Sequence, residues 1–69
     1  MVILTEKENR ILVAISNFIE EKGFSPTVRE IGDLTGFKSS SSVHKYLLLL
    51  RDKGKIEWNP TRNRTIVIK

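Results

Sequence analysis

The 69-residue sequence predicts one domain, residues 1–69, that is mostly α-helical and ends in a small β-hairpin. Three observations carry this prediction. Two capping-box motifs, at 5–8 and 27–30, each open a stretch with apolar residues at helical spacing. A third helical stripe starts inside a run of four serines, and two β-prone stretches near the C-terminus flank a turn-forming segment. Three helices plus a two-stranded wing, in this order, make a winged helix-turn-helix.

The first helix is predicted to begin after Thr5, whose hydroxyl can accept from the Glu8 amide while the Glu8 side chain returns to the cap. Gly23 is predicted to end it. Its apolar residues form one stripe on a 3.6-residue period. They are Ile11, Leu12, Ile15, Phe18 and Ile19.

The second helix is predicted to begin after Thr27, which forms a second capping box with Glu30. This helix is short, because Gly36 can take the left-handed conformation that terminates it. Ile31 and Leu34 are expected to form its inward face. About three residues then separate it from the third helix, which gives the turn of a helix-turn-helix.

The third helix is expected to be capped by Ser40 or Ser41 and to run to about Asp52, before Gly54. At 100° per residue its two faces differ in chemistry. One face is apolar and should be buried: Val43, Tyr46, Leu47 and Leu50. The other face carries side chains that can reach base edges when a helix enters the major groove: Ser41, Ser42, His44 and Lys45.

The hairpin is predicted from residues 55–58 and 65–68, with a basic loop at 59–64. Trp58 is expected to pack against the sheet or the third helix, with contact to DNA or to a protein as alternatives. Arg62 and Arg64 in the loop are expected to contact phosphate or to be solvated, and in either case to be mobile until something binds.

Charge is distributed unevenly along the chain. Residues 1–37 carry four basic and six acidic side chains, whereas residues 38–69 carry eight basic and two acidic ones, and the net charge is +4. The C-terminal half is therefore the part expected to face a polyanion. A solvated surface with a chance asymmetry is the alternative.

Composition also argues against several classes of protein. The chain has no cysteine and a single histidine, so we expect no disulfide, no metal site and no cofactor. Its longest apolar run, residues 47–50, is far too short to cross a bilayer, and the N-terminus lacks the layout of a signal peptide. No residues stand at catalytic spacing. We expect a cytoplasmic protein that is not an enzyme, does not engage a membrane and binds no small-molecule ligand.

Three segments carry a resemblance to a known family: PTVREIG at 26–32, SSSSVH at 39–44 and NPTR at 59–62. Over nearly the whole chain the sequence resembles the N-terminal DNA-binding domain of LexA repressors, especially the branch found in Gram-positive bacteria. The resemblance implies a repressor of the SOS type whose third helix enters the major groove of a palindromic operator with CGAAC-type half-sites. The wing would meet the backbone or the minor groove, and a second copy would occupy the adjacent half-site.

The resemblance also implies roles for individual residues. Base reading is expected of Ser39, Ser41, Ser42, His44 and Lys45. Contacts to the DNA backbone, from the helices or the wing, are expected of Thr27, Arg29, Lys38, Ser40, Lys53, Arg62 and Arg64. A full-length LexA continues into a self-cleaving peptidase domain, to which nothing in this sequence corresponds, so we expect no self-cleavage.

A different class of function is the rival hypothesis. The same fold could serve as a protein interaction module. Leu48, Leu49 and Trp58 would then form an apolar docking patch on the surface. Exposure of these side chains is what the rival hypothesis requires.

Overall fold

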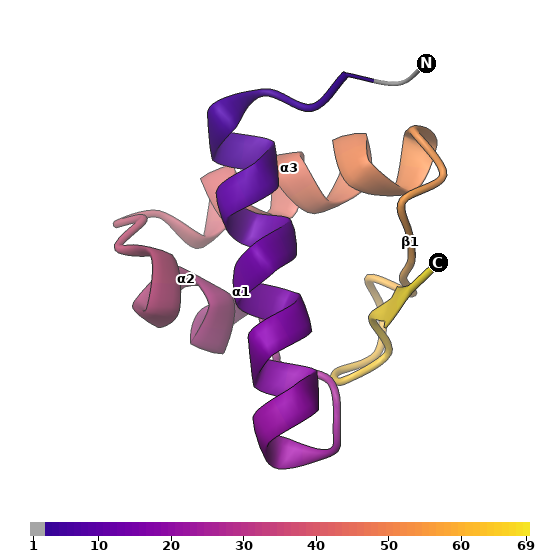
Figure 1. Ribbon diagram of the computed structural model, residues 1–69. Coiled ribbons are helices and arrows are strands. Elements are labelled where there is room, and N and C mark those ends of the chain that lie inside the picture. Colours follow the sequence, from indigo (N-terminus) through magenta and orange to yellow (C-terminus); the bar gives the residue numbers. More distant parts are fainter. Residues whose placement is uncertain (1–2) are drawn as a thin grey trace.

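The computed structural model describes residues 3–69 and has three helices followed by a two-stranded hairpin: α1 (Glu6–Lys22), α2 (Val28–Thr35), α3 (Ser40–Asp52), β1 (Ile56–Glu57) and β2 (Val67–Ile68). Each helix packs on the other two. In Figure 1, α2 and the hairpin lie on opposite sides of α1, and α3 crosses behind α1. The predicted winged helix-turn-helix is confirmed. Among the described residues, no helix is both long and apolar enough to cross a membrane.

Both predicted capping boxes are present. The Thr5 amide donates to Glu8 Oε1 at 2.9 Å, and the Glu8 amide donates to Thr5 Oγ1 at 3.2 Å. Thr27 and Glu30 exchange the same two bonds at 2.8 and 3.2 Å. Each box satisfies two amides that the first turn of a helix leaves without a partner. Both helices end at a glycine in the left-handed conformation, Gly23 and Gly36.

The cap of α3 differs from the prediction by one residue. Ser39, and not Ser40 or Ser41, is the N-cap, because its backbone is extended and its Oγ accepts from the Ser41 amide at 3.2 Å. The Ser39 carbonyl also accepts from the Ser42 amide at 3.2 Å. Any of the four consecutive serines could serve as the N-cap, because their side chains are identical. Only the backbone conformation decides which of them does so.

The hydrophobic core lies between the three helices and the hairpin. Its apolar residues are Ile11, Ile15, Ile31, Val43, Leu47, Leu50, Ile56, Trp58 and Ile66. The predicted inward position of Leu34 is wrong, since this side chain is 57% exposed. With eight residues, α2 turns only about twice; Ile31 is fully buried, and Val28 packs partly buried against the core.

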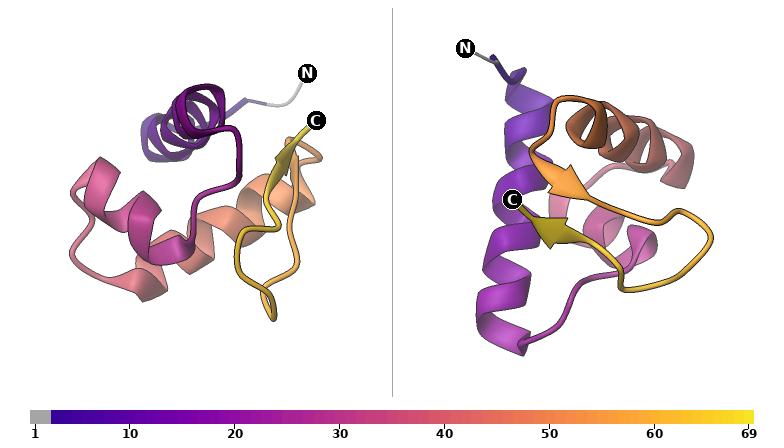
Figure 2. Two further views of the ribbon diagram at one scale, coloured as in Figure 1. Left: turned by 90° about the horizontal axis from the view of Figure 1, so that it is seen from below. Right: turned by 90° about the vertical axis from the view of Figure 1, so that its right-hand side faces the viewer.

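The hairpin is antiparallel as predicted, but its strands are shorter than expected. Only two pairs align, Ile56 with Ile68 and Glu57 with Val67. Beyond these pairs the two halves of the hairpin separate into the wide loop seen in Figure 2. There the Asn59 amide donates to Thr65 Oγ1 at 3.1 Å, and this hydroxyl donates back to the Asn59 carbonyl at 3.0 Å. Side-chain bonds therefore replace the strand ladder near the wing tip.

Candidate nucleic-acid interface

The two faces of α3 separate as the angles predict. Val43, Leu47 and Leu50 have no solvent exposure and fix the helix on α1 and the hairpin. Ser41 and Lys45, on the opposite side, are exposed together with Ser42. Because the buried stripe sets the rotation of the helix, the N-terminal end of α3 presents its polar edge outward.

The fold brings several predicted residues together where α2 and α3 begin. An open hollow there is lined by Val28, Arg29, Ser40, Ser41 and His44. An adjoining hollow shares Arg29 and Ser40 and adds Lys38 from the turn, together with one acidic residue, Asp33. Residues from two helices and the turn between them thus converge on one face.

The electrostatics of this face suit an anion. Within residues 3–69, Arg29, Lys38 and Lys45 form no ion pair, so their charges are unneutralised. The N-termini of α2 and α3 add a partial positive charge and amides that a phosphate oxygen can accept from. Shape and charge therefore both favour a polyanionic partner here.

His44 is not a freely solvated side chain. Its ring meets the Trp58 ring edge-on, with centroids 4.8 Å apart and planes at 73°, and it is half-buried. Trp58 itself is only 8% exposed and belongs to the core, which confirms its predicted packing role. This contact joins the polar edge of α3 to the residue that follows β1.

Burial of Trp58 removes it from the docking patch that the rival hypothesis proposed, so that assignment is wrong. Leu48 is half-buried against the core, and only Leu49, at 36% exposure, reaches solvent appreciably. The physical reason is that the hairpin packs on α3, which places Trp58 in the core beside His44. The three side chains do not form a free apolar surface.

Lys53 lies at the far end of α3 and its ammonium is already engaged. Its Nζ is 2.8 Å from Glu8 Oε1 and donates to the Ile3 carbonyl at 3.3 Å. Glu8 is 1% exposed, and its pKa lies below the usual value because of the Lys53 hydrogen bond and, next, the Thr5 amide. Lys53 thus ties α3 to the start of α1, which argues against its expected role as a backbone contact.

The two wing arginines differ. Arg62 is exposed, and its side chain forms no hydrogen bond or ion pair with residues 3–69. Arg64 was expected to be mobile, but its Nη1 lies 2.9 Å from Glu30 Oε1 and its Nη2 lies 3.3 Å from Glu30 Oε2. The pKa of Glu30 is held below its usual value, first by the Thr27 amide and then by Arg64. Arg64 is therefore fixed to the start of α2.

Ser25 is a structural residue that the sequence did not reveal. It is 9% exposed, and its Oγ accepts from the Ile66 amide at 3.1 Å while donating to the Pro26 carbonyl at 3.0 Å. The α1–α2 turn and the second half of the hairpin are thereby joined. A serine before a proline signals only a turn, so its partner 41 residues later could not be foreseen.

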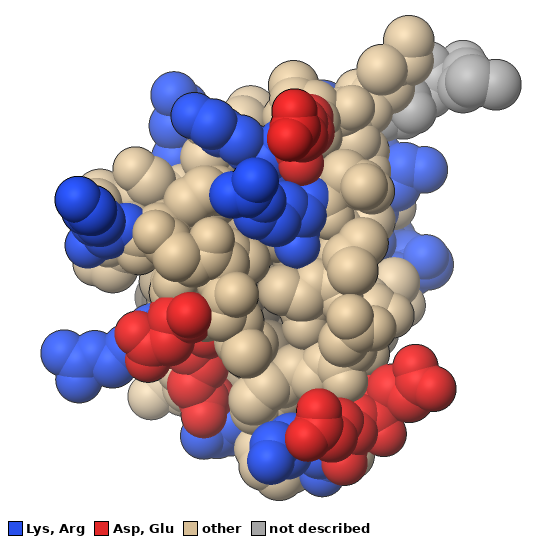
Figure 3. Space-filling view, turned by 60° about the vertical axis from the view of Figure 1, so that its left-hand side comes forward, with Lys and Arg blue, Asp and Glu red and all other residues tan. Residues whose placement is uncertain are grey.

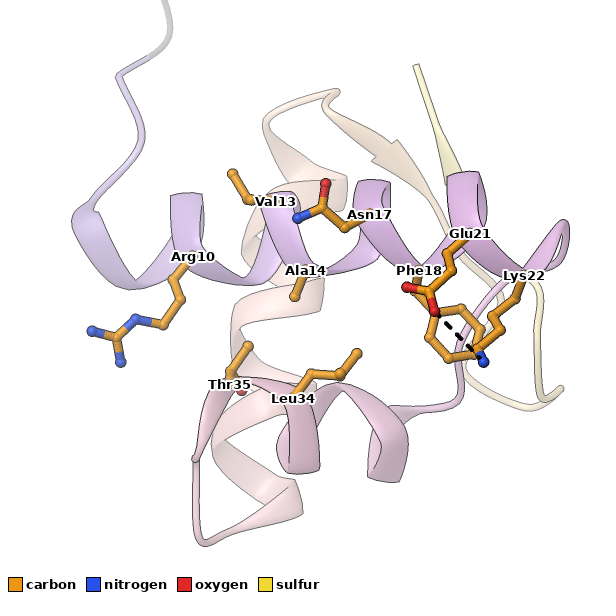
Figure 4. A pocket seen from close by; sticks show the side chains of 9 residues that line it. All are labelled: Arg10, Val13, Ala14, Asn17, Phe18, Glu21, Lys22, Leu34 and Thr35. Atoms are coloured by element: carbon orange, nitrogen blue, oxygen red, sulfur yellow. Dashed lines mark ion pairs between the residues drawn. The ribbon is translucent and has the colours of Figure 1, made fainter.

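A separate hollow lies on another face, between α1 and α2. Figure 3 shows an uncharged strip on this side, bordered by basic and acidic side chains, and Figure 4 shows the lining of the hollow with α3 behind. Val13 and Leu34 are the exposed apolar side chains there, at 48% and 57%. The lining is Arg10, Val13, Ala14, Asn17, Phe18, Glu21, Lys22, Leu34 and Thr35. None of these residues belongs to the predicted DNA-contacting set.

A buried helix stripe with an outward polar edge, a basic face at two helix N-termini and an adjoining hairpin define the winged helix-turn-helix class of DNA-binding domains. The family model of the LexA DNA binding domain matches residues 1–65 of this chain. The chain belongs to that family, as the resemblance implied.

Curated relatives agree with this assignment. The chain is 46% identical over 65 residues to the LexA repressor of Desulfitobacterium hafniense (strain DSM 10664 / DCB-2), covering 94% of this chain and 32% of the relative. The LexA repressor of Caldicellulosiruptor saccharolyticus is 48% identical with the same coverages. That of Bifidobacterium longum (strain DJO10A) is 45% identical over 94% of this chain and 27% of the relative. The chain thus spans roughly a third of the length of these proteins.

Proposed function

We propose that this domain binds double-stranded DNA in a sequence-specific manner and represses transcription by occupying a palindromic operator of the SOS type. The N-terminal end of α3 enters the major groove, and the wing follows the backbone or the minor groove. One observation carries the proposal. A fully buried stripe on α3 turns a row of small polar side chains outward, beside two helix N-termini and unpaired cations.

Side-chain chemistry supports the proposed base-reading roles. A lysine donates to the O6 and N7 acceptors of guanine, and serine hydroxyls donate to or accept from either kind of base edge. Ser39 Oγ accepts from the Ser41 amide, which leaves its hydroxyl proton free for a base or a phosphate. The proposed base-reading residues are Ser39, Ser41, Ser42, His44 and Lys45.

The proposed backbone contacts surround this edge. Thr27 Oγ1 accepts from the Glu30 amide and so keeps its hydroxyl proton for a phosphate oxygen. Phosphate contacts set register and orientation without reading sequence. The proposed set is Thr27, Arg29, Lys38, Ser40 and Arg62. Lys53 and Arg64 leave the set because their cations are paired within the domain.

A single domain of this size would bind one half-site with modest affinity, so tight binding needs two copies about one DNA turn, roughly 34 Å, apart. The similarity to LexA repressors supports repression as the outcome of operator occupancy. Selection of bound duplexes from a random pool tests sequence specificity and the two-copy arrangement. Recovery of an inverted repeat supports the proposal, and recovery of unrelated sequences contradicts it.

A titration with paired variants tests the site itself. Ser41→Ala combined with Lys45→Ala should reduce affinity for the recovered duplex far more than affinity for a scrambled one. Lys22→Ala is the matched control, since it also removes one positive charge but lies on α1 beside Glu21. Equal losses on both duplexes for the double variant would exclude sequence reading by this edge, because only the charge-dependent part of binding would then have changed.

A further inference from the structure

Arg64 makes an unusual number of contacts for a residue in a loop. Besides its two bonds to Glu30, its Nη1 donates to the Ser25 carbonyl at 3.0 Å, and its Cζ lies 4.8 Å from the centroid of the Phe24 ring. Its backbone has a φ of 57°, and Arg64 is the one non-glycine residue with positive φ within 3–69. This conformation is unfavourable for a long side chain, so these contacts also compensate local strain.

Glu30 holds two parts of the fold with one carboxylate. Its Oε1 accepts from the Thr27 amide at 2.8 Å and from Arg64 at 2.9 Å. The first bond belongs to the cap of α2, and the second reaches 34 residues along the chain to the wing. The start of α2, where Thr27 is the N-cap and Arg29 lines the hollow shared with α3, is therefore joined directly to the wing.

We propose that the Glu30–Arg64 pair is a latch that sets the position of the wing relative to the reading edge of α3. This inference rests on the proposed function. Arg64 is a positioning residue and not a phosphate contact, and Arg62 is the wing cation that meets phosphate. A preorganised wing avoids the entropy that ordering a loop would cost during binding.

The two possible roles of Arg64, phosphate contact and positioning, predict opposite changes in DNA affinity when the charge of Glu30 is removed. If Arg64 contacted phosphate, Glu30→Gln would raise the net charge by one, release the arginine for DNA and strengthen binding. If the pair is a latch, Glu30→Gln frees the wing and weakens binding, although the protein becomes more positive. Glutamine can still accept from the Thr27 amide in a capping box, so the cap of α2 is retained.

The test measures affinity for an operator duplex at several salt concentrations, using Glu30→Gln, Arg64→Gln, the double variant and Arg62→Gln. We expect Glu30→Gln and Arg64→Gln each to weaken binding by about 3- to 10-fold, with the salt slope of the wild type. The double variant should bind the operator duplex no more weakly than either single variant, because each single substitution already removes the same interaction. Arg62→Gln, the matched control, should reduce the slope by about 0.9, the value for one phosphate contact.

Tighter binding by Glu30→Gln, or a slope reduced by about 0.9 in Arg64→Gln, would overturn the latch. A structural readout separates this failure from failure of the proposed function. Amide relaxation and hydrogen exchange should show residues 59–65 more mobile in both single variants, with or without DNA. If the wild type fails to prefer the operator, the proposed function fails. If wing mobility does not change in the variants, the latch fails.

Discussion

Replacing Lys53 by methionine removes one ammonium and keeps most of the side-chain length. In the wild type this group lies 2.8 Å from Glu8 Oε1, and Glu8 is 1% exposed. The other carboxylate oxygen, Oε2, has no hydrogen-bond partner among the described residues. Loss of the ammonium would leave a buried carboxylate whose remaining hydrogen bond is the one that Oε1 accepts from the Thr5 amide.

The expected magnitude follows from this burial. Removing one partner of a buried pair costs about 3–5 kcal/mol. The Lys53 side chain is 29% exposed, so water can partly replace it, and we expect about 2–3 kcal/mol. A domain of this size rarely has more than about 3–5 kcal/mol in total. At about 4–8 °C per kcal/mol, the melting temperature should fall by roughly 10–20 °C.

Thermal unfolding followed by circular dichroism at pH 7 measures the effect. Lys22→Met is the matched control, because its pair with Glu21 is 3.8 Å long and exposed, and such pairs contribute about 0–1 kcal/mol. The pair also predicts a pH dependence. The lowered pKa of Glu8 stabilises the fold above the unfolded value of about 4.3, and this stabilisation is lost as pH falls through the folded pKa.

Methionine at position 53 removes the largest cause of that lowered pKa. The difference in unfolding free energy between wild type and variant should therefore be largest near neutral pH and should shrink below about pH 4. A variant that melts within about 2 °C of the wild type at pH 7 would refute the reasoning. So would a difference that grows on acidification, since protonated Glu8 no longer needs the cation.

Three further predictions concern packing. Leu47→Ala should destabilise the fold by about 2–5 kcal/mol in urea titration, because this side chain is fully buried; a loss below about 1 kcal/mol would contradict its place in the core. Leu34→Gln should change stability by no more than about 0.5 kcal/mol in the same assay, because Leu34 is exposed. Emission of the single tryptophan, Trp58, should change when duplex binds, since its ring contacts His44, and His44→Ala should abolish most of that change.

The sequence predicts the helices well because their signals are local. Each capping box spans four residues, and each glycine stop acts on the turn beside it, so no distant contact is needed. The buried stripe of α3 is likewise a local pattern, and it determines which polar side chains of this helix face outward. Leu34 departs from this local pattern because Val28, Ile31 and Leu34 are spaced three apart, so each lies about 60° around the helix from the one before, and Leu34 falls outside the buried face.

The candidate site is less predictable from sequence where it depends on ion pairs. Arg64 meets Glu30 across 34 residues, and Lys53 meets Glu8 across 45. A charge pattern shows that cations are present but not which of them a carboxylate neutralises. The same limitation applies to Ser25, whose partner lies in the hairpin. Long-range packing thus decides which basic residues remain available to DNA.

Chemical-shift mapping of the ¹⁵N-labelled domain with an operator duplex shows which residues DNA contacts. We expect the largest changes at residues 41–45, with smaller ones at the start of α2 and at Arg62 in the wing. Changes confined to the groove around Val13 and Leu34, with residues 41–45 unaffected, would contradict it.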